Sequence, residues 1–297
     1  MPPAFELYFR DSRKLNAFIK TCEALSVQSD TALFKVKSRG VYILLTDFES
    51  FSCSEARMTE EIQSFFKIYC KEFTAKILLD SLSNILRQIL KNKRHALVWG
   101  EMPTSDQTSP PLLQVKELSP QKKKIMGQYT VESTEHRARV YHVISTKQFR
   151  QKSKEYVQFR LVNQEFNKLI TMQAILSGSN GGVGVLRATP SQTKTGEPRL
   201  LIRFYIENQS GGYGFTTIHT YPGSDVVPVI RMPSSVVETR YLVTFLKRAQ
   251  NLFTVPSDYV TLYVSEKGIL VQTDTKDHHS VVLCIADISN IDLGSYV

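Results

Sequence analysis

The sequence predicts an α+β fold of two topologically similar domains, each with antiparallel sheets and two helices. Three observations support this prediction. Most apolar residues alternate with polar ones, as in half-buried strands, whereas four segments show apolar residues at the three- and four-residue spacing of helices. The order of elements in the first half of the chain recurs in the second half, about 150 residues later. A chain of 297 residues, of which 42% are hydrophobic, can bury a core in each half.

Two helices are expected in the first half. The first follows the capping residues Asp11 and Ser12, and its apolar face consists of Leu15, Phe18, Ile19 and Cys22. The second begins near Leu79, and its apolar face consists of Leu82, Ile85, Leu86, Ile89 and Leu90. Strands are predicted around these helices at residues 5–9, in a hairpin within 31–48, at 74–79, and between 95 and 143.

The second half repeats this plan. Strand 156–162 leads into a third helix, capped by Asn163, with Phe166, Leu169, Ile170 and Leu176 inward. Strands follow at 183–188, 200–206, 215–220 and 226–232, and a fourth helix then buries Leu242, Phe245, Leu246, Ala249, Leu252 and Phe253. A strand meander within 260–285 closes the chain. We therefore predict an N-terminal domain at residues 1–144, a connector at 145–155 and a C-terminal domain at 156–297.

The outer faces of the four helices are expected to be almost entirely basic or neutral. Each residue advances about 100° around a helix axis, so the residues opposite the apolar face can be named. They are Arg13, Ala17, Lys20 and Ala24 in the first helix; Asp80, Asn84, Arg87 and Lys91 in the second; Gln164, Lys168 and Thr171 in the third; and Arg240, Thr244, Lys247 and Asn251, with Arg248 at the edge, in the fourth. A solvated helix face usually mixes both signs, and the net charge of +9 favours polyanionic partners. These faces predict a surface that meets phosphates, with a solvated surface charge as the alternative for each cation.

Basic residues also gather outside these faces. Lys91, Lys93 and Arg94 end the second helix, where cations also interact favourably with the helix dipole. A loop with Lys122, Lys123 and Lys124 is expected either to reach around DNA or to be solvated. The full predicted DNA-binding set is Arg13, Lys14, Lys20, Arg87, Lys91, Lys93, Arg94, Lys122, Lys123, Lys124, Lys168, Arg240, Lys247 and Arg248.

The repeated layout resembles DNA sliding clamps of the proliferating-cell-nuclear-antigen type and the related herpesvirus DNA polymerase processivity factors. Residues 156–161, with the sequence YVQFRL, and the following Glu165 and Phe166 are similar to the start of a clamp's second domain. Residues 260–288 are similar to its closing hairpin. The resemblance implies two clamp domains, with the sheets outside and the helices on the DNA-facing side. It also implies a partner-binding groove near Val143, Ile144 and Phe149.

The function that this resemblance implies is that of a non-enzymatic processivity factor in the nucleus. Such a factor binds double-stranded DNA without sequence specificity and tethers a DNA polymerase catalytic subunit. Ring-forming eukaryotic clamps are typically acidic, whereas this chain is basic. It is therefore closer to the viral factors, which hold DNA electrostatically as monomers or dimers. A homo-oligomer, either a dimer or a trimer, is compatible with this interpretation.

Motifs of several common enzyme classes are absent from the sequence. It contains no G-x-x-x-x-G-K-[ST] loop, no H-E-x-x-H and no G-x-S-x-G. The four cysteines lack C-x-x-C spacing, which favours reduced thiols in an intracellular protein. We therefore predict no catalytic residues, no metal site and no cofactor. We also predict no membrane association, because no apolar stretch approaches about 18 residues.

Three alternatives to a processivity factor stay open. The chain could be a subunit of a checkpoint-type clamp, which requires unlike partner subunits. It could be a nucleic-acid-processing enzyme with an unrecognised site. It could also be a scaffold protein whose basic charge is incidental.

Overall fold

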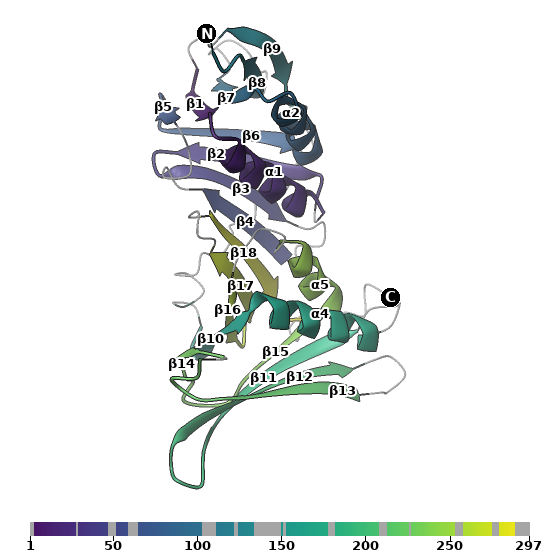
Figure 1. Ribbon diagram of the computed structural model, residues 1–297. Helices are drawn as coiled ribbons and strands as arrows, with labels where there is room; N and C mark the ends of the chain where they lie inside the picture. Colours follow the sequence, from purple (N-terminus) through teal and green to yellow (C-terminus); the bar gives the residue numbers. More distant parts are fainter. Residues whose placement is uncertain are drawn as a thin grey trace.

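The fold is mainly antiparallel β-structure with helices along one side. The computed structural model describes residues 3–27, 29–46, 52–58, 65–102, 111–121, 124–133, 150, 153–177, 182–207, 213–225, 227–252, 258–274 and 279–288. Every pairing between its strands is antiparallel. The molecule is elongated, with the first half of the chain at one end and the second half at the other (Figure 1). The predicted α+β class is therefore confirmed.

The elements of the first half are β1 (Phe5–Phe9), α1 (Ser12–Ser26), β2 (Thr31–Lys37), β3 (Gly40–Thr46), β4 (Ser52–Met58), β5 (Phe65–Ile68), β6 (Glu72–Leu78), α2 (Leu79–Lys91), β7 (His95–Glu101), β8 (Leu112–Leu118) and β9 (Ile125–Thr130). Those of the second half are β10 (Tyr156–Val162), α4 (Asn163–Ser177), β11 (Val183–Gln192), β12 (Pro198–Glu207), β13 (Tyr213–Thr220), β14 (Val229–Arg231), β15 (Val237–Leu242), α5 (Val243–Leu252), β16 (Tyr259–Ser265), β17 (Gly268–Asp274) and β18 (His279–Ala286).

Each half contains two β–α–β–β–β units in succession. The first half consists of β1, α1 and β2–β4, followed by β6, α2 and β7–β9. The second half consists of β10, α4 and β11–β13, followed by β15, α5 and β16–β18. The short strands β5 and β14 are additions beside β1 and β10. The repeat that the sequence pattern predicted is thus present in the order of elements.

Within each half, the two units exchange their first strands. The meander β2–β4 takes β6 from the second unit as its fourth strand, and β7–β9 takes β1 from the first unit. In the second half, β11–β13 takes β15 and β16–β18 takes β10. Each sheet is therefore completed by the other unit, so the two units of a half depend on each other.

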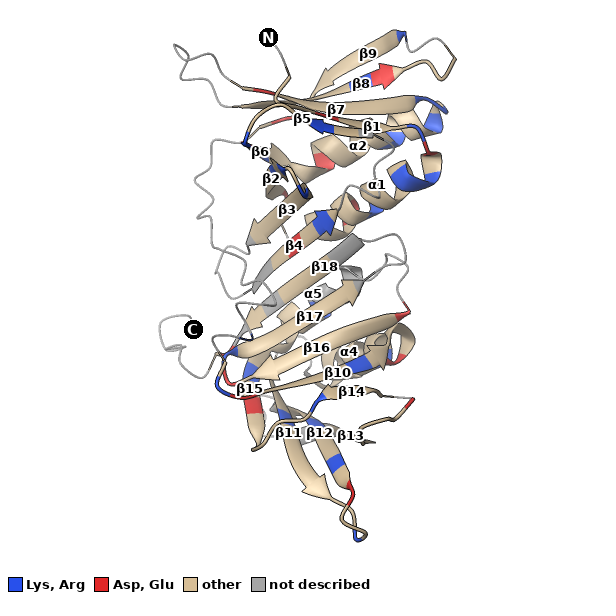
Figure 2. Ribbon diagram, turned by 90° about the vertical axis from the view of Figure 1, so that its left-hand side faces the viewer, with Lys and Arg blue, Asp and Glu red and all other residues tan. Residues whose placement is uncertain are grey.

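Strands β4 and β18 join the two halves. Their register runs from Met58 opposite His279 to Ser52 opposite Ile285. The pairing creates one nine-stranded sheet in the order β14-β10-β16-β17-β18-β4-β3-β2-β6 (Figure 2). Helix α1 packs against α5, and α5 contacts β18. We call this combination of a strand pair and a helix pair the central joint.

Three phenylalanine rings connect the two sheets of the first half. Phe5 of β1 lies 4.9 Å from the Phe73 ring and 6.1 Å from the Phe34 ring, measured between centroids. Gly100 of β7 lies beside them, and a Cβ atom there would be 2.5 Å from the Phe5 ring and 2.6 Å from the Phe73 ring. The absence of a side chain at Gly100 is therefore what lets the two sheets close around these rings.

The sequence-based start of the fourth helix was wrong, because residues 237–242 form strand β15. Val237, Thr239 and Tyr241 are buried and alternate with exposed residues. The Tyr241 hydroxyl donates a hydrogen bond of 2.9 Å to Oε1 of Gln173 on α4. Burial raises the pKa of Tyr241, so the phenol stays protonated and able to donate. Alternating β-branched and aromatic residues are a strand signal.

Two further predictions concern the chain as a whole. No helix in the described part of the chain combines the length and the apolar character needed to cross a membrane. The predicted connector at residues 145–155 lies largely outside the described residues. The domain boundaries therefore stay a prediction.

Replacing Gly100 with alanine should lower the free energy of unfolding by about 1–3 kcal/mol, because the new methyl group overpacks the Phe5 and Phe73 rings. Urea denaturation measures this change. The matched control is Gly127→Ala on β9, where the new methyl group meets only the end of the Tyr129 side chain. Equal losses in the two variants would show that the phenylalanine contact is not the cause.

Candidate nucleic-acid interface

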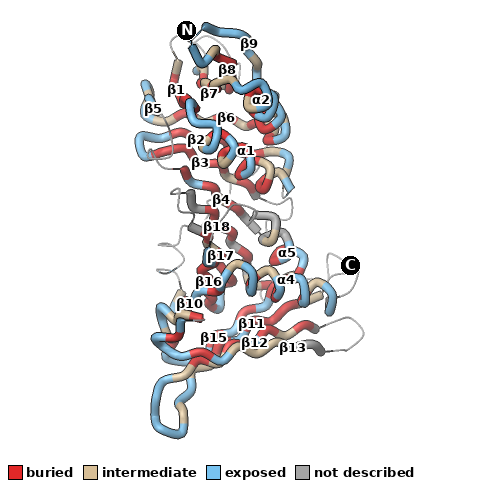
Figure 3. Tube along the Cα trace, in the orientation of Figure 1, coloured by how far each residue is buried: buried red, intermediate tan, exposed pale blue. Residues whose placement is uncertain are grey.

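The four helices form one row along the molecule, in the order α2, α1, α5 and α4 (Figure 1). Neighbouring helices in this row pack against one another. Each helix is exposed on one side and buried toward the sheets (Figure 3). We call the exposed side of the row the helical face. The predicted outer stripes, which come from four separate segments of the chain, therefore lie on one surface.

On α1 and α2, the exposed cations of the helical face are Arg13, Lys20, Arg87 and Lys91. Arg87 forms an ion pair with Glu23 of α1 and donates a hydrogen bond of 3.2 Å to Asn84. An exposed pair of this kind adds little stability, but Glu23 offsets one positive charge. This part of the face is therefore less uniformly basic than the sequence predicted.

On α4 and α5, the charge is more balanced. Lys168 forms an ion pair of 2.8 Å with Glu165, one turn earlier on the same helix. Gln250 of α5 donates a hydrogen bond of 3.3 Å to the hydroxyl of Thr171 on α4, which ties the two helices together. The predicted residues that are exposed here are Gln164, Lys168, Thr171, Thr244 and Lys247.

Three sequence-based assignments on the helices were wrong. Arg240 lies on β15, and its neighbour Tyr241 points toward α4, so the Arg240 side chain faces the opposite side of the sheet. Ala24 is buried, because α1 has a helix on each side, α2 and α5, and its exposed arc is narrow. Leu176, expected inward, is exposed at the end of α4. Each error depends on neighbouring elements that a single helix does not reveal.

Several predicted residues fall outside what the structure describes. Lys122 and Lys123 belong to this group, as do the partner-groove residues Val143, Ile144 and Phe149. Arg248 lies within α5, but its side chain is not described. Lys124 is described and exposed, just before β9. The predictions for the undescribed residues stay predictions.

The end of α2 has an unusual backbone conformation at Lys93. This residue has φ of 54°, in the left-handed region where glycine is usual. The N–H of Lys93 bonds to the carbonyl of Leu90 at 3.0 Å, and that of Arg94 bonds to the carbonyl of Ile89 at 3.1 Å. These two bonds form the Schellman motif that closes many helices. Lys93 thus keeps a charge where glycine would be less strained.

Arg150, within the predicted connector, contacts the side of the nine-stranded sheet away from the helices. Its guanidinium lies 5.1 Å from the Tyr263 ring centroid and donates to the Tyr263 hydroxyl at 3.2 Å. Gln158 donates to the same hydroxyl, also at 3.2 Å. Tyr263 packs with Tyr156 and Leu270 in a small second cluster. The connector therefore reaches an aromatic surface on that side of the sheet.

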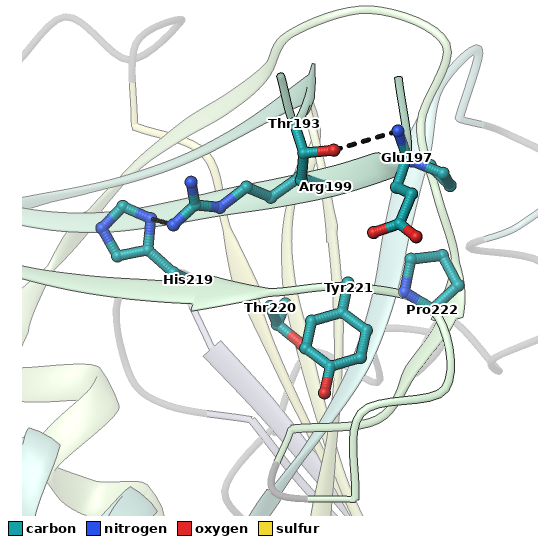
Figure 4. A pocket seen from close by; sticks show the side chains of 8 residues that line it. Thr193, Glu197, Arg199, His219, Thr220, Tyr221 and Pro222 are labelled. Atoms are coloured by element: carbon teal, nitrogen blue, oxygen red, sulfur yellow. Dashed lines mark hydrogen bonds between the residues drawn. The ribbon is translucent and has the colours of Figure 1, made fainter. Parts of the chain in front are cut away.

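A polar groove of about 690 Å³ lies at the turn of the long β11–β12 hairpin (Figure 4). Arg199 donates to Nδ1 of His219 at 2.7 Å. A guanidinium only donates, so Nδ1 accepts and the ring proton lies on Nε2. The backbone N–H of Glu197 bonds to the Thr193 hydroxyl at 3.0 Å. The groove thus presents one cation, one imidazole and one carboxylate, and their contacts show no pairing of a nucleophile with a base.

Metal ligands do not cluster in the part of the chain that the structure describes: no three His, Cys, Asp or Glu side chains there lie close enough to hold an ion. No protein-family model matches the chain, and a search of curated proteins finds no match. The chemistry of the chain's own surfaces therefore has to carry the functional argument.

Sequence reasoning also missed an apolar patch at the end of α4. Met172, Ile175 and Leu176 are 38%, 73% and 41% exposed. Met172 Sδ accepts a hydrogen bond of 3.8 Å from Thr216 on β13, so the patch lies beside that strand. The signal was present, because Ile175 continues the outer stripe of Gln164, Lys168 and Thr171 at helical spacing.

Replacing Lys93 with glycine should raise the free energy of unfolding by about 1 kcal/mol, because glycine adopts the left-handed conformation without a steric penalty. Urea denaturation measures the change. The control, Lys93→Ala, removes the same charge but keeps the strain, and it should not stabilise. A similar gain from alanine would mean that charge, not backbone strain, sets the effect.

Proposed function

We propose that the chain is a DNA polymerase processivity factor of the sliding-clamp kind. It binds double-stranded DNA without sequence preference on its helical face and tethers a replicative polymerase. The observation that carries the proposal is the helical face itself. Four helices from two similarly built halves form one row, and the exposed charges of that row are mostly basic.

The helical face suits contact with a phosphate backbone. Lysine and arginine side chains that meet phosphates release condensed counterions, which gives affinity without base recognition. Lys20, Lys91 and Lys247 are exposed on three different helices. Short neutral residues such as Asn84 and Thr244 lie beside them and let a duplex approach closely. Contacts of this kind carry no sequence information, which fits binding without sequence preference.

The layout of the chain also supports the proposal. A processivity factor needs one surface for DNA and another for the polymerase. Here the helices occupy one side and the nine-stranded sheet the other (Figures 1 and 2). The aromatic cluster of Tyr156, Tyr263 and Leu270, which Arg150 contacts, lies on the side away from the helices. We place the polymerase contact near this cluster, beside the connector.

The proposal extends to self-association, because α1 and α4 hold equivalent places in their halves. When Ser12 of α1 is aligned with Asn163 of α4, the buried Leu15, Phe18 and Ile19 coincide with the buried Phe166, Leu169 and Ile170. In the same alignment, three residues that are buried on α1 correspond to exposed residues on α4. Those on α1 are Thr21, Ala24 and Leu25, and those on α4 are Met172, Ile175 and Leu176.

This difference follows from the central joint. Helix α1 packs on α5 beside the β4–β18 pair. The equivalent strands β9 and β13 are sheet edges, each paired on one side in the described structure. Ile125 and Met126 of β9 are both 52% exposed. A second copy that brings β9 and α2 to β13 and α4 would repeat the central joint and cover both apolar edges.

The alternatives make different predictions. A checkpoint-type subunit would pair with unlike chains, so self-association counts against it. A nucleic-acid-processing enzyme would turn over DNA, with the Arg199–His219 groove as the first place to test. A scaffold protein with incidental charge would not show tight, salt-sensitive duplex binding.

We expect the protein to bind a scrambled 30-base-pair duplex with a steep salt dependence. A variant with Lys20, Arg87, Lys91, Lys168 and Lys247 replaced by alanine should show a log–log salt slope smaller by about two to four units, because each neutralised phosphate contributes about 0.9 to the slope. Fluorescence anisotropy across a salt series measures both slopes.

The matched control for this experiment removes five exposed cations outside the helical face, namely Lys154, Arg160, Lys194, Arg203 and Lys267. Its slope should stay close to that of the natural protein. If the two variants bind the duplex with equally reduced affinity, the helical face is not the DNA site.

Ile175→Glu should abolish self-association, because it places a charge in an apolar contact between copies. Sedimentation velocity of the natural protein should show concentration-dependent oligomers, and the variant should sediment as a monomer. Val236→Glu, at a residue 46% exposed on another surface, is the control and should leave the oligomers intact. A natural protein that is monomeric at high concentration would contradict the proposed contact.

A further inference from the structure

Strand register brings three basic segments to one edge of the sheet β5-β1-β7-β8-β9. Phe9 at the end of β1 pairs with Ala96 near the start of β7. His95 pairs with Leu118 at the end of β8, and Leu118 pairs with Ile125 at the start of β9. The start of α1, the end of α2 and the β8–β9 turn therefore lie side by side.

These three segments carry a concentration of positive charge. We call it the basic rim, and it consists of Arg10, Arg13, Lys91, Lys93, Arg94 and Lys124. Five of these residues are exposed and Arg94 is partly buried. In Figure 2 the start of α1 and the end of α2 show as blue segments on the same side of the upper half. Arg10 reaches the outer side of the sheet, where it stacks 5.0 Å from the Tyr8 ring centroid.

The nearby acids offset little of this charge. Asp11 caps α1 by accepting a hydrogen bond of 2.7 Å from the backbone N–H of Arg13. Glu117 is buried and accepts a hydrogen bond of 3.1 Å from the Tyr129 hydroxyl. The rim therefore keeps a net positive charge over three adjacent segments.

Helix dipoles do not account for the whole rim. Cations at the end of α2 interact favourably with the dipole of that helix. Arg13, however, lies in the first turn of α1, which contains no acidic residue and where the dipole disfavours a cation. A bound anion would offset the positive charge at both helix ends.

The equivalent edge of the second half is different. There the register places Val162 at the end of β10 opposite Tyr259 at the start of β16. The described residues along this edge include the acids Glu165 and Asp258, and Lys168 is already paired with Glu165. Two halves with the same order of elements thus have opposite charge character at the same edge.

We propose that the basic rim holds the phosphodiester backbone of DNA, so that the first half of the chain grips the duplex more strongly than the second. This inference rests on the proposed function, and it adds that the duplex is held off-centre. Six cations from three segments, arranged along one edge, match a polyanion of regularly spaced charges. The rim is continuous with Arg13 and Lys91 of the helical face, so one backbone could contact both.

His95 provides an independent readout within the rim. Its Nδ1 lies 3.0 Å from the Tyr8 hydroxyl, and the rings meet edge to face. Burial and the neighbouring Arg10 guanidinium lower the pKa of His95. A phosphate that binds Arg10 would offset this repulsion and raise the pKa of His95 again.

The test compares two variants that each remove two cations. Arg13→Gln with Lys124→Gln removes charge from the rim, and the Asp11 cap survives because it uses the Arg13 backbone. Lys168→Gln with Lys247→Gln removes the same charge from the second half. We expect the rim variant to bind a scrambled 30-base-pair duplex at least ten-fold more weakly, with a salt slope lower by about 1.8. The second-half variant should bind about three-fold more weakly or less. Unchanged melting temperatures exclude unfolding as the cause.

A titration of His95 by NMR, with and without the same duplex, completes the test. We expect bound DNA to raise the pKa of His95 by about half a unit or more. Duplex binding that is weakened equally in both variants, with an unshifted His95, would overturn the rim inference and leave the proposed function intact. Failure of the natural protein to bind duplex at all would overturn the proposed function. Equal binding of poly-glutamate would overturn the rim inference in favour of an acidic-peptide site.

Discussion

The backbone pairing of β4 with β18 is the contact on which the rest of the architecture depends. It joins residues from opposite ends of the chain, such as Cys53 and Cys284, into one sheet. Because both halves then share that sheet, α1 meets α5 and the four helices form a single row. Without this pairing, each half would present two helices and an open strand edge. Backbone hydrogen bonds do not depend on side-chain identity, so this contact places few demands on the sequences of the two halves.

Much of the fold could be predicted from local patterns. The Asp11 cap and the apolar spacing of α1 and α2 predict those helices well, since both signals are contained within one element. The central joint could not be predicted in the same way. Residues 52–58, with the sequence SCSEARM, show no clear apolar alternation, and their partner strand lies more than two hundred residues further along the chain. The exchange of first strands between units is likewise a property of pairing, which no single segment encodes.

The candidate site shows the same division. Periodicity correctly assigned Lys20, Arg87 and Lys168 to exposed helix positions. It did not predict that Glu23 would pair with Arg87 or that α5 would narrow the exposed arc of α1, because both depend on a neighbouring helix. Most residues of the basic rim were in the sequence-based set, but the grouping of Arg13, Lys93 and Lys124 at one edge emerges only through strand register. Register also reveals the unequal charge of the two halves.

The distance along the chain between β4 and β18 has a consequence for synthesis on the ribosome. About 220 residues separate the two strands, and at roughly 5–20 residues per second the second strand follows the first by about ten to forty seconds. During that interval the finished first half carries a strand edge that is ready to pair with any other extended chain. Neighbouring nascent copies on one messenger RNA would offer the same edge. The cell must therefore keep these copies apart, or shield that edge with a chaperone, until each chain supplies its own last strand.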